Sequence, residues 1–380
     1  MEQNIMTNQR IPAEVFPPGD LVREELEARG WTQEVLAEVM GRPGRLISEI
    51  IAGKRAITPE TARGLAAAFG TDATFWANLD AAYRVKQVKH ADEEVARRSA
   101  IYSYAPVREM IKRGWVTPSE NVSVLEERVK DFFNVKSLDE QPSFACASKA
   151  TAGPATSAQM AWLFRVKHVA TKVKVRGKYT EKALRVAIDQ LATLRSSPPS
   201  IQGVPAILAK AGLPLLYVES LPGAKIDGVC FWFDKATPVI AMSLRHDRID
   251  NYWFVLRHEL EHVLHRHGQG SPILDTELDG ERAGTGPSVA EDERVANGAA
   301  AAWCIPQADL VALISQRGAA LSDIDVTAFA ADHKIHPGLV AGQIQYQTQR
   351  YDRFRKHLVK VREFAFLDAV VDGWGNVAKT

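Results

Sequence analysis

The stretch LRHELEHVLHRH, residues 256–267, carries two histidines four positions apart and a glutamate directly after the first of them. In an α-helix, residues i and i+4 lie on one face, about one turn apart. His258 and His262 can therefore offer both imidazoles to one tetrahedral zinc ion. Glu259 is placed to act as a general base on a metal-bound water. The spacing predicts a hydrolytic zinc site, and the alternative is a half-exposed helix whose histidines fall there by chance.

The segments on either side of this stretch predict an α+β domain. Three segments before it have the composition of buried strands, and the last two are close enough to form a hairpin. They are LPLLYVES (213–220), GVCFWFD (228–234) and TPVIAMS (237–243). After the histidine helix, we expect a polar, Gly-rich loop over 268–289 and a helix that ends at Pro306. Two further helices are expected around 307–318 and 321–333.

The N-terminal part reads as a run of five short helices between Pro17 and about Tyr83. Thr32 and Thr58 stand at N-cap positions, where a side-chain oxygen can accept from the backbone of the first turn. Glycines close four of the helices, at Gly30, Gly41, Gly53 and Gly70. The tight turn between the second and third helices is typical of a helix-turn-helix domain, whose third helix would be the recognition helix.

Between these parts, residues 86–200 look mainly helical, and RSSPPSIQG (195–203) reads as a loop at a domain boundary. Eight Lys or Arg and one acid fall between Arg165 and Arg185. We interpret this basic strip as a solvated helical face and loop, and the alternative is a surface for an anionic partner.

Composition sets further bounds. The 380 residues are 46% hydrophobic and 24% charged, which is ordinary for a globular protein of two or three domains. The net charge of +1 gives no argument for a nucleic-acid or membrane partner. Cys146, Cys230 and Cys304 are too widely spaced for a disulfide framework, so each is expected to be a small buried hydrophobe. Because neither a signal peptide nor a membrane span is visible, we expect a cytoplasmic protein.

Two resemblances cover most of the chain. Residues 11–84 resemble the HigA-type antitoxins of the Cro/C1 (XRE) helix-turn-helix superfamily, in the stretches WTQEVLAEVMGRP, LISEIIAGKRAITPETARGLAAAFGT and FWANLDAAY. Residues 205–345 resemble the ImmA/IrrE metallopeptidases, in IDGVCFWF, PVIAMSLR, RHELEHVLH, ERVANGAAAAWCIP and KIHPGLVAGQIQ. Members of the second family are known for cleaving repressor proteins, so the resemblance implies a regulator that joins DNA binding to proteolysis.

The resemblance also implies a set of site residues. In that family the two histidines and a later glutamate in an E-x-x-A-N segment hold zinc, which here would be His258, His262 and Glu293, with Glu259 as catalytic base. Manganese remains possible at such a site. One position departs from the family, because Glu261 stands where a small residue is usual. We expect it to point to solvent, and the alternatives are altered metal affinity or a blocked substrate path.

Helical spacing separates the two acids that compete as third ligand. A stripe of inward residues is expected at Ala296, Ala299, Ala300 and Trp303. Glu293 shares this face, whereas Glu291 lies five positions before Ala296 and should face solvent. Asn297, one turn after Glu293, is a candidate to hydrogen-bond a neighbour of the site. His336 is a weak candidate for oxyanion stabilisation, and we favour a role as the first residue of a helix.

The DNA-binding part is less strongly marked. Residues 1–85 hold nine Lys or Arg and twelve Asp or Glu, whereas phosphate contacts need clustered positive charge. The residues expected to meet DNA on or beside the third helix are Arg42, Arg45, Ser48, Lys54 and Arg55. The alternative is a helix-turn-helix that is kept for dimerisation or partner binding.

The sequence as a whole predicts a multidomain, mainly α protein with an α+β part. We expect a flexible tail (1–10), a five-helix Cro/C1-type domain (11–85), a helical middle region (86–200), a zincin-like peptidase domain (201–345) and a C-terminal extension (346–380). The expected partners are double-stranded operator DNA, a protein substrate such as a repressor or a toxin–antitoxin partner, and a second copy in a homodimer, with no membrane. The alternative function is an antitoxin-like transcription factor whose peptidase fold senses a signal or binds a toxin without cleaving.

Overall fold

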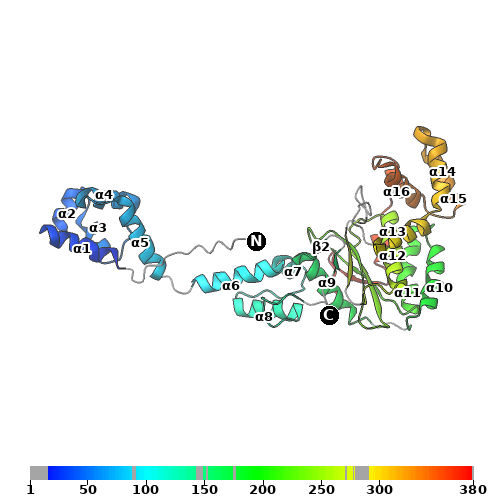
Figure 1. The fold of residues 1–380 in the computed structure, drawn as a ribbon, viewed down its shortest axis with the longest axis horizontal. Helices are drawn as coiled ribbons and strands as arrows, with labels where there is room; N and C mark the ends of the chain where they lie inside the picture. Colours follow the sequence, from blue (N-terminus) through cyan, green and yellow to red (C-terminus); the bar gives the residue numbers. More distant parts are fainter. Residues whose placement is uncertain are drawn as a thin grey trace. The chain divides into compact units, whose positions relative to one another are not determined.

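The computed structural model describes residues 16–87, 91–142, 149–150, 153–173, 177–269, 272–276, 278 and 291–378. The chain divides into two compact units, Met1–Arg97 and Arg98–Thr380, with the division inside helix α6 (Ala91–Tyr104) (Figure 1). Each unit is described by itself below. The expected tail at 1–10 and Cys146 lie outside the described residues.

The first unit contains the predicted run of helices. These are α1 (Pro18–Arg29), α2 (Gln33–Met40), α3 (Gly44–Ile51), α4 (Pro59–Phe69) and α5 (Ala73–Gln87). The Thr32 and Thr58 side chains accept from the backbone N–H three residues on, which confirms both predicted N-caps. The α2–α3 turn is short because Gly41 closes α2 in a left-handed conformation and Pro43 precedes α3. The helices enclose one core around Leu36, Ile47, Leu65 and Trp76.

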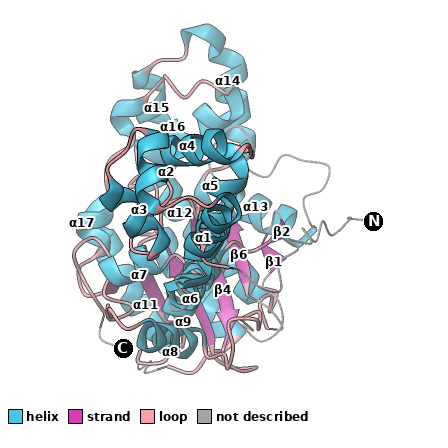
Figure 2. Ribbon diagram, turned by 90° about the vertical axis from the view of Figure 1, so that its left-hand side faces the viewer, coloured by secondary structure: helices cyan, strands magenta, loops and turns pink. Residues whose placement is uncertain are grey.

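The described residues of the second unit form one mixed sheet with strand order β2-β1-β6-β4-β5-β3-β7. Figure 2 shows its strands in magenta, with β1, β2, β4 and β6 labelled. The strands are β1 (Lys149–Ala150), β2 (Gly153–Pro154), β3 (Leu215–Val218), β4 (Ile226–Trp232), β5 (Pro238–Met242), β6 (Ile273–Thr276) and β7 (Val370–Asp372). The predicted hairpin is confirmed, because β4 and β5 pair antiparallel with Cys230 opposite Ile240. β3 lies between β5 and β7 and is parallel to both.

Helices cover the sheet on both faces, which explains why its central strands are buried along their whole length and mainly apolar. Successive strand residues point to opposite faces. Tyr217 and Ile240 therefore join the core that contains α12, whereas Leu216 and Val239 join the core that contains α8 and α9. The α-helices of the second unit that follow α6 are, in chain order, α7 (Val107–Lys112), α8 (Val122–Phe133), α9 (Ser157–Ala170), α10 (Glu181–Ala192), α11 (Val204–Lys210), α12 (Ile249–Leu264), α13 (Glu291–Cys304), α14 (Gln307–Arg317), α15 (Asp323–Asp332), α16 (Pro337–Thr348) and α17 (Arg362–Ala365).

Membrane-spanning character was tested on the same helices. Among the described residues, no single helix has both the length and the apolar character needed to cross a membrane. A bent pair, Glu291–Cys304 with Gln307–Ala320, meets the criteria only by length and composition.

Three features of the sheet differ from what the sequence indicates. β1 and β2 come from the expected middle region, and β7 comes from the expected C-terminal extension, so both ranges contribute to the sheet of the second unit. β6 lies within the stretch expected to be loop, and that expectation is wrong for Ile273–Thr276. Strands of two to four residues show no usable periodicity, and they are defined by pairing with distant strands instead.

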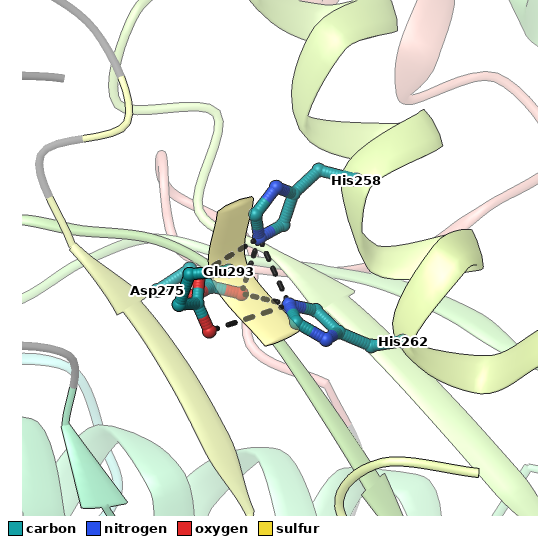
Figure 3. Close-up of side chains that lie close together, drawn as sticks. All are labelled: His258, His262, Asp275 and Glu293. Carbon is teal, nitrogen blue, oxygen red and sulfur yellow. Dashed lines mark hydrogen bonds and ion pairs between the residues drawn. The ribbon is translucent and has the colours of Figure 1, made fainter. Parts of the chain in front are cut away.

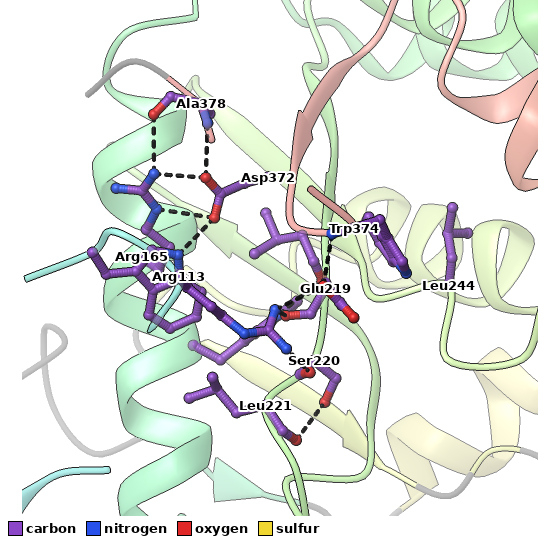
Figure 4. A network of polar contacts seen from close by, with 12 residues as sticks. Arg113, Arg165, Glu219, Ser220, Leu221, Leu244, Asp372, Trp374 and Ala378 are labelled. Carbon is purple, nitrogen blue, oxygen red and sulfur yellow. Dashed lines mark hydrogen bonds and ion pairs between the residues drawn. The ribbon is translucent and has the colours of Figure 1, made fainter. Parts of the chain in front are cut away.

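The basic strip between Arg165 and Arg185 also differs from expectation at its first residue. Arg165 on α9 is buried and pairs with Asp372 at the end of β7, with Nη2 and Oδ1 2.6 Å apart (Figure 4). The same carboxylate accepts from Trp115 Nε1 at 2.8 Å and from the Ala378 backbone N–H at 2.8 Å. The network ties α9 to the last strand, so Arg165 does not belong to a solvated face.

Candidate metal centre

Helix α12 carries the two histidines on a fully buried face. His258, Glu259 and His262 are each 0% exposed. Most of the remaining circumference is buried as well, because Trp253, Leu256, Leu260 and Val263 fill the core between this helix and the sheet. The one-turn spacing brings the two Nε2 atoms to 3.0 Å from each other, so both imidazoles point to the same place (Figure 3).

Two carboxylates complete this cluster from other elements. Asp275 comes from β6 and Glu293 from the first turn of α13, and both are buried. His258 Nε2 lies 3.3 Å from Asp275 Oδ2 and 3.4 Å from Glu293 Oε2. His262 Nε2 lies 3.7 Å from Asp275 Oδ2 and 3.5 Å from Glu293 Oε1. The four ligand atoms all lie within 4.8 Å of one another, close enough to surround one ion.

The chemistry of this donor set fits a divalent metal. Apart from their contacts with the two histidines, both oxygens of Asp275 and Oε2 of Glu293 are buried and make no hydrogen bond among the described residues. Buried carboxylate oxygens in that condition are costly unless a cation neutralises them. Imidazole nitrogens with carboxylate oxygens are ligands that zinc accepts, and two carboxylates also suit manganese.

The ionisation of the cluster is consistent with metal binding. Burial lowers the pKa of His262 to about 4, which leaves this imidazole in the neutral form that binds metals. Burial opposes charge on His258 too, but Asp275 and Glu293 outweigh it and raise the pKa of His258 to about 9. Burial and the charge of Asp275 raise the pKa of Glu293 to about 7. Because metal ligands must be deprotonated, ion binding here would release protons.

Glu259 lies beside the cluster in a space that a glycine provides. A Cβ at Gly228 on β4 would stand only 2.0 Å from Glu259 Oε1, so a larger residue would displace the carboxyl group. Both Glu259 oxygens lack a hydrogen-bond partner among the described residues. Burial, followed by the charge of Asp275, raises the pKa of Glu259 well above its usual value. A buried carboxyl group with a raised pKa is suited to accept and return a proton.

His267 contacts the far side of one candidate ligand. Its Nδ1 lies 3.0 Å from Nδ1 of His262, and its Nε2 lies 3.5 Å from Oδ1 of Asp292. If Nε2 of His262 faces a metal, Nδ1 carries the proton and donates it to His267. His267 then carries its own proton on Nε2, facing Asp292. The chain of three side chains would hold the His262 ring in the orientation and tautomer that metal binding requires.

Glu261 does not point to solvent, contrary to the expectation from its departure from the family pattern. Its side chain is only 12% exposed and pairs with Arg257, with Nη1 and Oε2 2.6 Å apart, and with His265 at 3.1 Å. Burial would raise the pKa of Glu261, but Arg257 and His265 outweigh it and lower that pKa. Glu261 therefore forms ion pairs with Arg257 and His265, and it is not part of the four-residue cluster.

The other predicted site residues are placed as follows. Glu291 is exposed and pairs with Arg294, whereas Glu293 is buried in the cluster. Asn297 is half-buried and lines a cavity next to α13. His336 is the N-cap of α16, where its Nδ1 accepts from the Gly338 backbone N–H at 3.0 Å. That contact is the helix-starting role that we favoured.

Asp275 was missed by sequence reasoning. The only signal is a short apolar run before it, in SPILDT, between the two predicted ligand helices. Only the pairing of β6 with β4 and β1 places this aspartate beside the histidines.

Most of the cationic side chains on and beside α3, the third helix of the first unit, form ion pairs with acidic side chains. Arg45 and Arg55 both pair with Glu49, at 2.7 Å and 3.2 Å, and Arg42 pairs with Glu60 at 3.3 Å. Ser48 and Lys54 are exposed. All five residues expected to meet DNA thus lie at the surface on or beside α3, but three of the four cations are partly neutralised by acids.

Two family models match the chain, one within each unit. Residues 22–76 match the helix-turn-helix family model, and residues 214–339 match the IrrE N-terminal-like domain of peptidase family M78. The chain joins a helix-turn-helix domain to an IrrE-like peptidase domain. The peptidase match begins just before β3 and ends in α16, so it contains all four residues of the buried cluster.

Individual relatives match the helix-turn-helix domain. Virulence-associated protein I from Dichelobacter nodosus is 34% identical over 79 residues, which are 20% of this chain and 73% of that protein. A HigA-family addiction module antidote protein from Coxiella burnetii is 36% identical over 20% of this chain and 82% of its own, with a TM-score of 0.19. Pseudomonas aeruginosa antitoxin HigA, solved with the higBA promoter, is 26% identical over 20% of this chain and 95% of its own, with a TM-score of 0.19.

Proposed function

We propose that this protein is a DNA-binding regulator whose second unit is a zinc-dependent endopeptidase acting on another regulatory protein. The observation that carries the proposal is the buried cluster of His258, His262, Asp275 and Glu293, with Glu259 directly beside it. The match to an IrrE-like peptidase domain over the same residues supports it.

The residues divide the chemistry among them. When bound, a zinc ion would supply Lewis acidity toward a carbonyl oxygen and toward water, and His258, His262 and Glu293 would hold it with one position left for water. Glu259 takes the proton of the attacking water and then returns it to the nitrogen of the leaving amine. The Glu259 carboxyl group is fully buried beside the cluster, where it can hold the proton between the two transfers.

A cleavage screen tests this proposal. We expect the zinc-loaded protein to produce new peptide termini from a repressor or toxin–antitoxin partner, as detected by mass spectrometry. Glu259→Gln should retain zinc and produce none of these termini, because Gln has nearly the same shape but cannot accept the proton. Identical termini from both proteins, or from neither, would refute the endopeptidase.

For the first unit, we propose binding to double-stranded operator DNA as a homodimer. The helix-turn-helix match and the exposed positions of Arg45, Ser48 and Lys54 support DNA binding. Helix-turn-helix proteins commonly bind as dimers to two half-sites one helical turn apart. Footprinting on the promoter of the protein's own gene should show a protected site with two-fold symmetry, and loss of protection with unrelated competitor DNA would refute it.

A second candidate function is a metal-responsive regulator that does not cleave. Four protein ligands close the tetrahedral shell of a structural zinc site, whereas catalytic sites keep one position open. Asp275 is the residue that supplies the fourth ligand, and its position favours this candidate. In that case zinc should change the affinity for operator DNA while the cleavage screen stays negative, and Glu259→Gln should respond to zinc like the wild type.

A further inference from the structure

A cavity of about 240 Å³ lies between α12, α13 and α16. Its walls are mainly apolar or small, with polar groups from Asp250, Asn251, Asn297 and Gln343. The larger lining side chains include Phe254, Leu278 and Tyr346, and Asn297 and Ala301 line the cavity from α13.

The cavity adjoins the metal cluster along each element that supplies a ligand. Phe254 precedes His258 by four residues on α12, and the two rings are stacked with centroids 6.4 Å apart. Asn297 follows Glu293 by four residues on α13. Leu278 follows Asp275 by three residues. Each of these wall residues therefore lies about one helical turn, or three residues, from one of the cluster residues.

Small residues keep this space open. Gly298, Ala301 and Gly342 line it, and a Cβ built at Gly298 meets no atom within 4 Å. A cavity of roughly 150 Å³ lined by apolar groups is already large enough to hold benzene. The present volume therefore accommodates a phenylalanine, leucine or methionine side chain, and the apolar walls favour such a group over a charged one.

We propose that this cavity is the pocket that receives a large apolar side chain of the substrate, from a residue flanking the cleaved bond. The proposal rests on the endopeptidase function proposed above. Asn297, the lining residue of α13 that is closest in sequence to Glu293, would offer its amide to the substrate backbone. Specificity for the protein substrate would thus include one buried apolar anchor.

Ala301 and Ala302 provide a matched pair of variants. Ala301 lines the cavity, whereas its neighbour Ala302 is exposed on the same helix. Leucine is a good helix former, so Ala301→Leu should fill the pocket and Ala302→Leu should not. In cleavage profiling with a peptide library, the wild type and Ala302→Leu should prefer Phe, Leu or Met at one position flanking the cut. Ala301→Leu should lose at least about tenfold in kcat/KM for those peptides and shift to Ala or Val.

A second variant guards against misfolding, because it should act in the opposite direction. Tyr346→Ala enlarges the cavity and should extend the preference to Trp, while both variants should bind as much zinc as the wild type. An unchanged preference in Ala301→Leu with normal zinc content would overturn the proposal.

A binding measurement separates the pocket from the peptidase activity. Zinc-loaded Glu259→Gln protein is titrated by calorimetry with a peptide hydroxamate that bears a benzyl side chain, and with the same compound bearing a methyl group. We expect the benzyl compound to bind at least about tenfold more tightly, and Ala301→Leu to abolish the difference. If the wild type cleaves nothing but the benzyl compound binds more tightly, the endopeptidase function is refuted and the side-chain pocket is supported. If cleavage occurs while both compounds bind equally, the side-chain pocket is refuted and the endopeptidase function is supported.

Discussion

At the level of single residues, the orientation of His262 depends on a contact outside the metal cluster. His267 meets Nδ1 of His262 through its own Nδ1. The side-chain oxygen of asparagine can occupy nearly the same position as that nitrogen and can also accept a hydrogen bond. We therefore predict that His267→Ala weakens zinc binding by roughly 10-fold to 100-fold, and that His267→Asn restores most of the loss.

Competition with a chromophoric chelator measures these affinities. His265→Ala is the comparison variant, because His265 stacks on His267 with ring centroids 5.5 Å apart and pairs with Glu261, but it contacts no cluster residue. Equal weakening by His267→Asn and His267→Ala would show that the position matters only for packing. Equal weakening by the His265 variant would show a general effect of removing a histidine from this end of α12.

A second residue-scale prediction concerns the glycine beneath Glu259. Gly228→Ala would place a methyl group 2.0 Å from the present position of Glu259 Oε1, so the carboxyl group must move. Misplacement of a catalytic group by about 1 Å can reduce the rate by a factor of roughly 100. We expect kcat/KM to fall by about that factor while the bound zinc, measured by elemental analysis, is unchanged.

Gly203→Ala serves as the control, because its new methyl group would have its nearest neighbour at 3.9 Å. Full activity in the Gly228 variant would show that Glu259 either does not act in the reaction or tolerates displacement.

These residues show which features of the candidate site can be predicted from the sequence and which cannot. Glu293 could be separated from Glu291 because helical periodicity alone decides which of them faces inward. Gly228 could have been noticed, since an isolated glycine in a strand often marks a close approach of another group. Glu261 was misjudged because its exposure depends on an ion pair with Arg257 one turn earlier, a contact that spacing permits but does not establish.

At the level of elements, helices were predictable and short strands were not. The caps of α2 and α4 and the apolar face of α12 are local features, so the sequence indicates where these helices lie. β6 has four residues, and it is a strand because β4 and β1 lie on either side of it. Asp275 consequently enters the candidate site only through non-local pairing, which a single sequence does not reveal.

Helix α3 carries a prediction about DNA binding. Glu49 holds Arg45 and Arg55 on the surface where phosphates would lie. Exposed ion pairs are weak, so Arg45 and Arg55 can exchange Glu49 for phosphates, and removing the acid should tighten binding by roughly threefold to tenfold. We therefore expect Glu49→Gln to raise affinity for the operator. Lys54→Ala should lower it and reduce the salt dependence by about one phosphate contact.

Fluorescence anisotropy across a range of salt concentrations tests both changes. Lys182→Ala is the control, because this exposed lysine belongs to the second unit. If Glu49→Gln and Lys54→Ala both leave the affinity and the salt dependence unchanged, α3 does not contact DNA, and a role in dimerisation or partner binding would be favoured.

At the level of the whole molecule, the second unit is assembled from ranges far apart in the chain. The sheet takes strands from near residue 150 and near residue 370, on either side of the segment that matches the peptidase family. Composition indicated a middle region and an extension, because charge and Pro/Gly patterns mark loops but do not show which loops separate folding units. Among the described residues, the Arg165–Asp372 pair is one of the polar contacts that join distant ranges of the chain.

The last prediction tests this joint. Asp372 is 1% exposed, and its carboxylate accepts from Arg165, Trp115 and the Ala378 backbone. Asp372→Ala leaves the buried Arg165 guanidinium without its counter-charge, which should lower the free energy of unfolding by roughly 3–5 kcal/mol. We expect urea unfolding of the second unit to shift to lower concentration, with faster hydrogen exchange in α9 and β3. Peptides from α1–α5 should exchange as in the wild type.

Two further variants distinguish a lost charge pair from lost packing. Asp352→Asn, at an exposed pair with Arg350, should leave the urea midpoint nearly unchanged. Combining Arg165→Met with Asp372→Leu should recover much of the loss, because replacing both members of a buried pair removes the unpaired charge as well. A double variant that is no more stable than Asp372→Ala would mean that the hydrogen bonds from Trp115 and Ala378, rather than Arg165, make Asp372 indispensable.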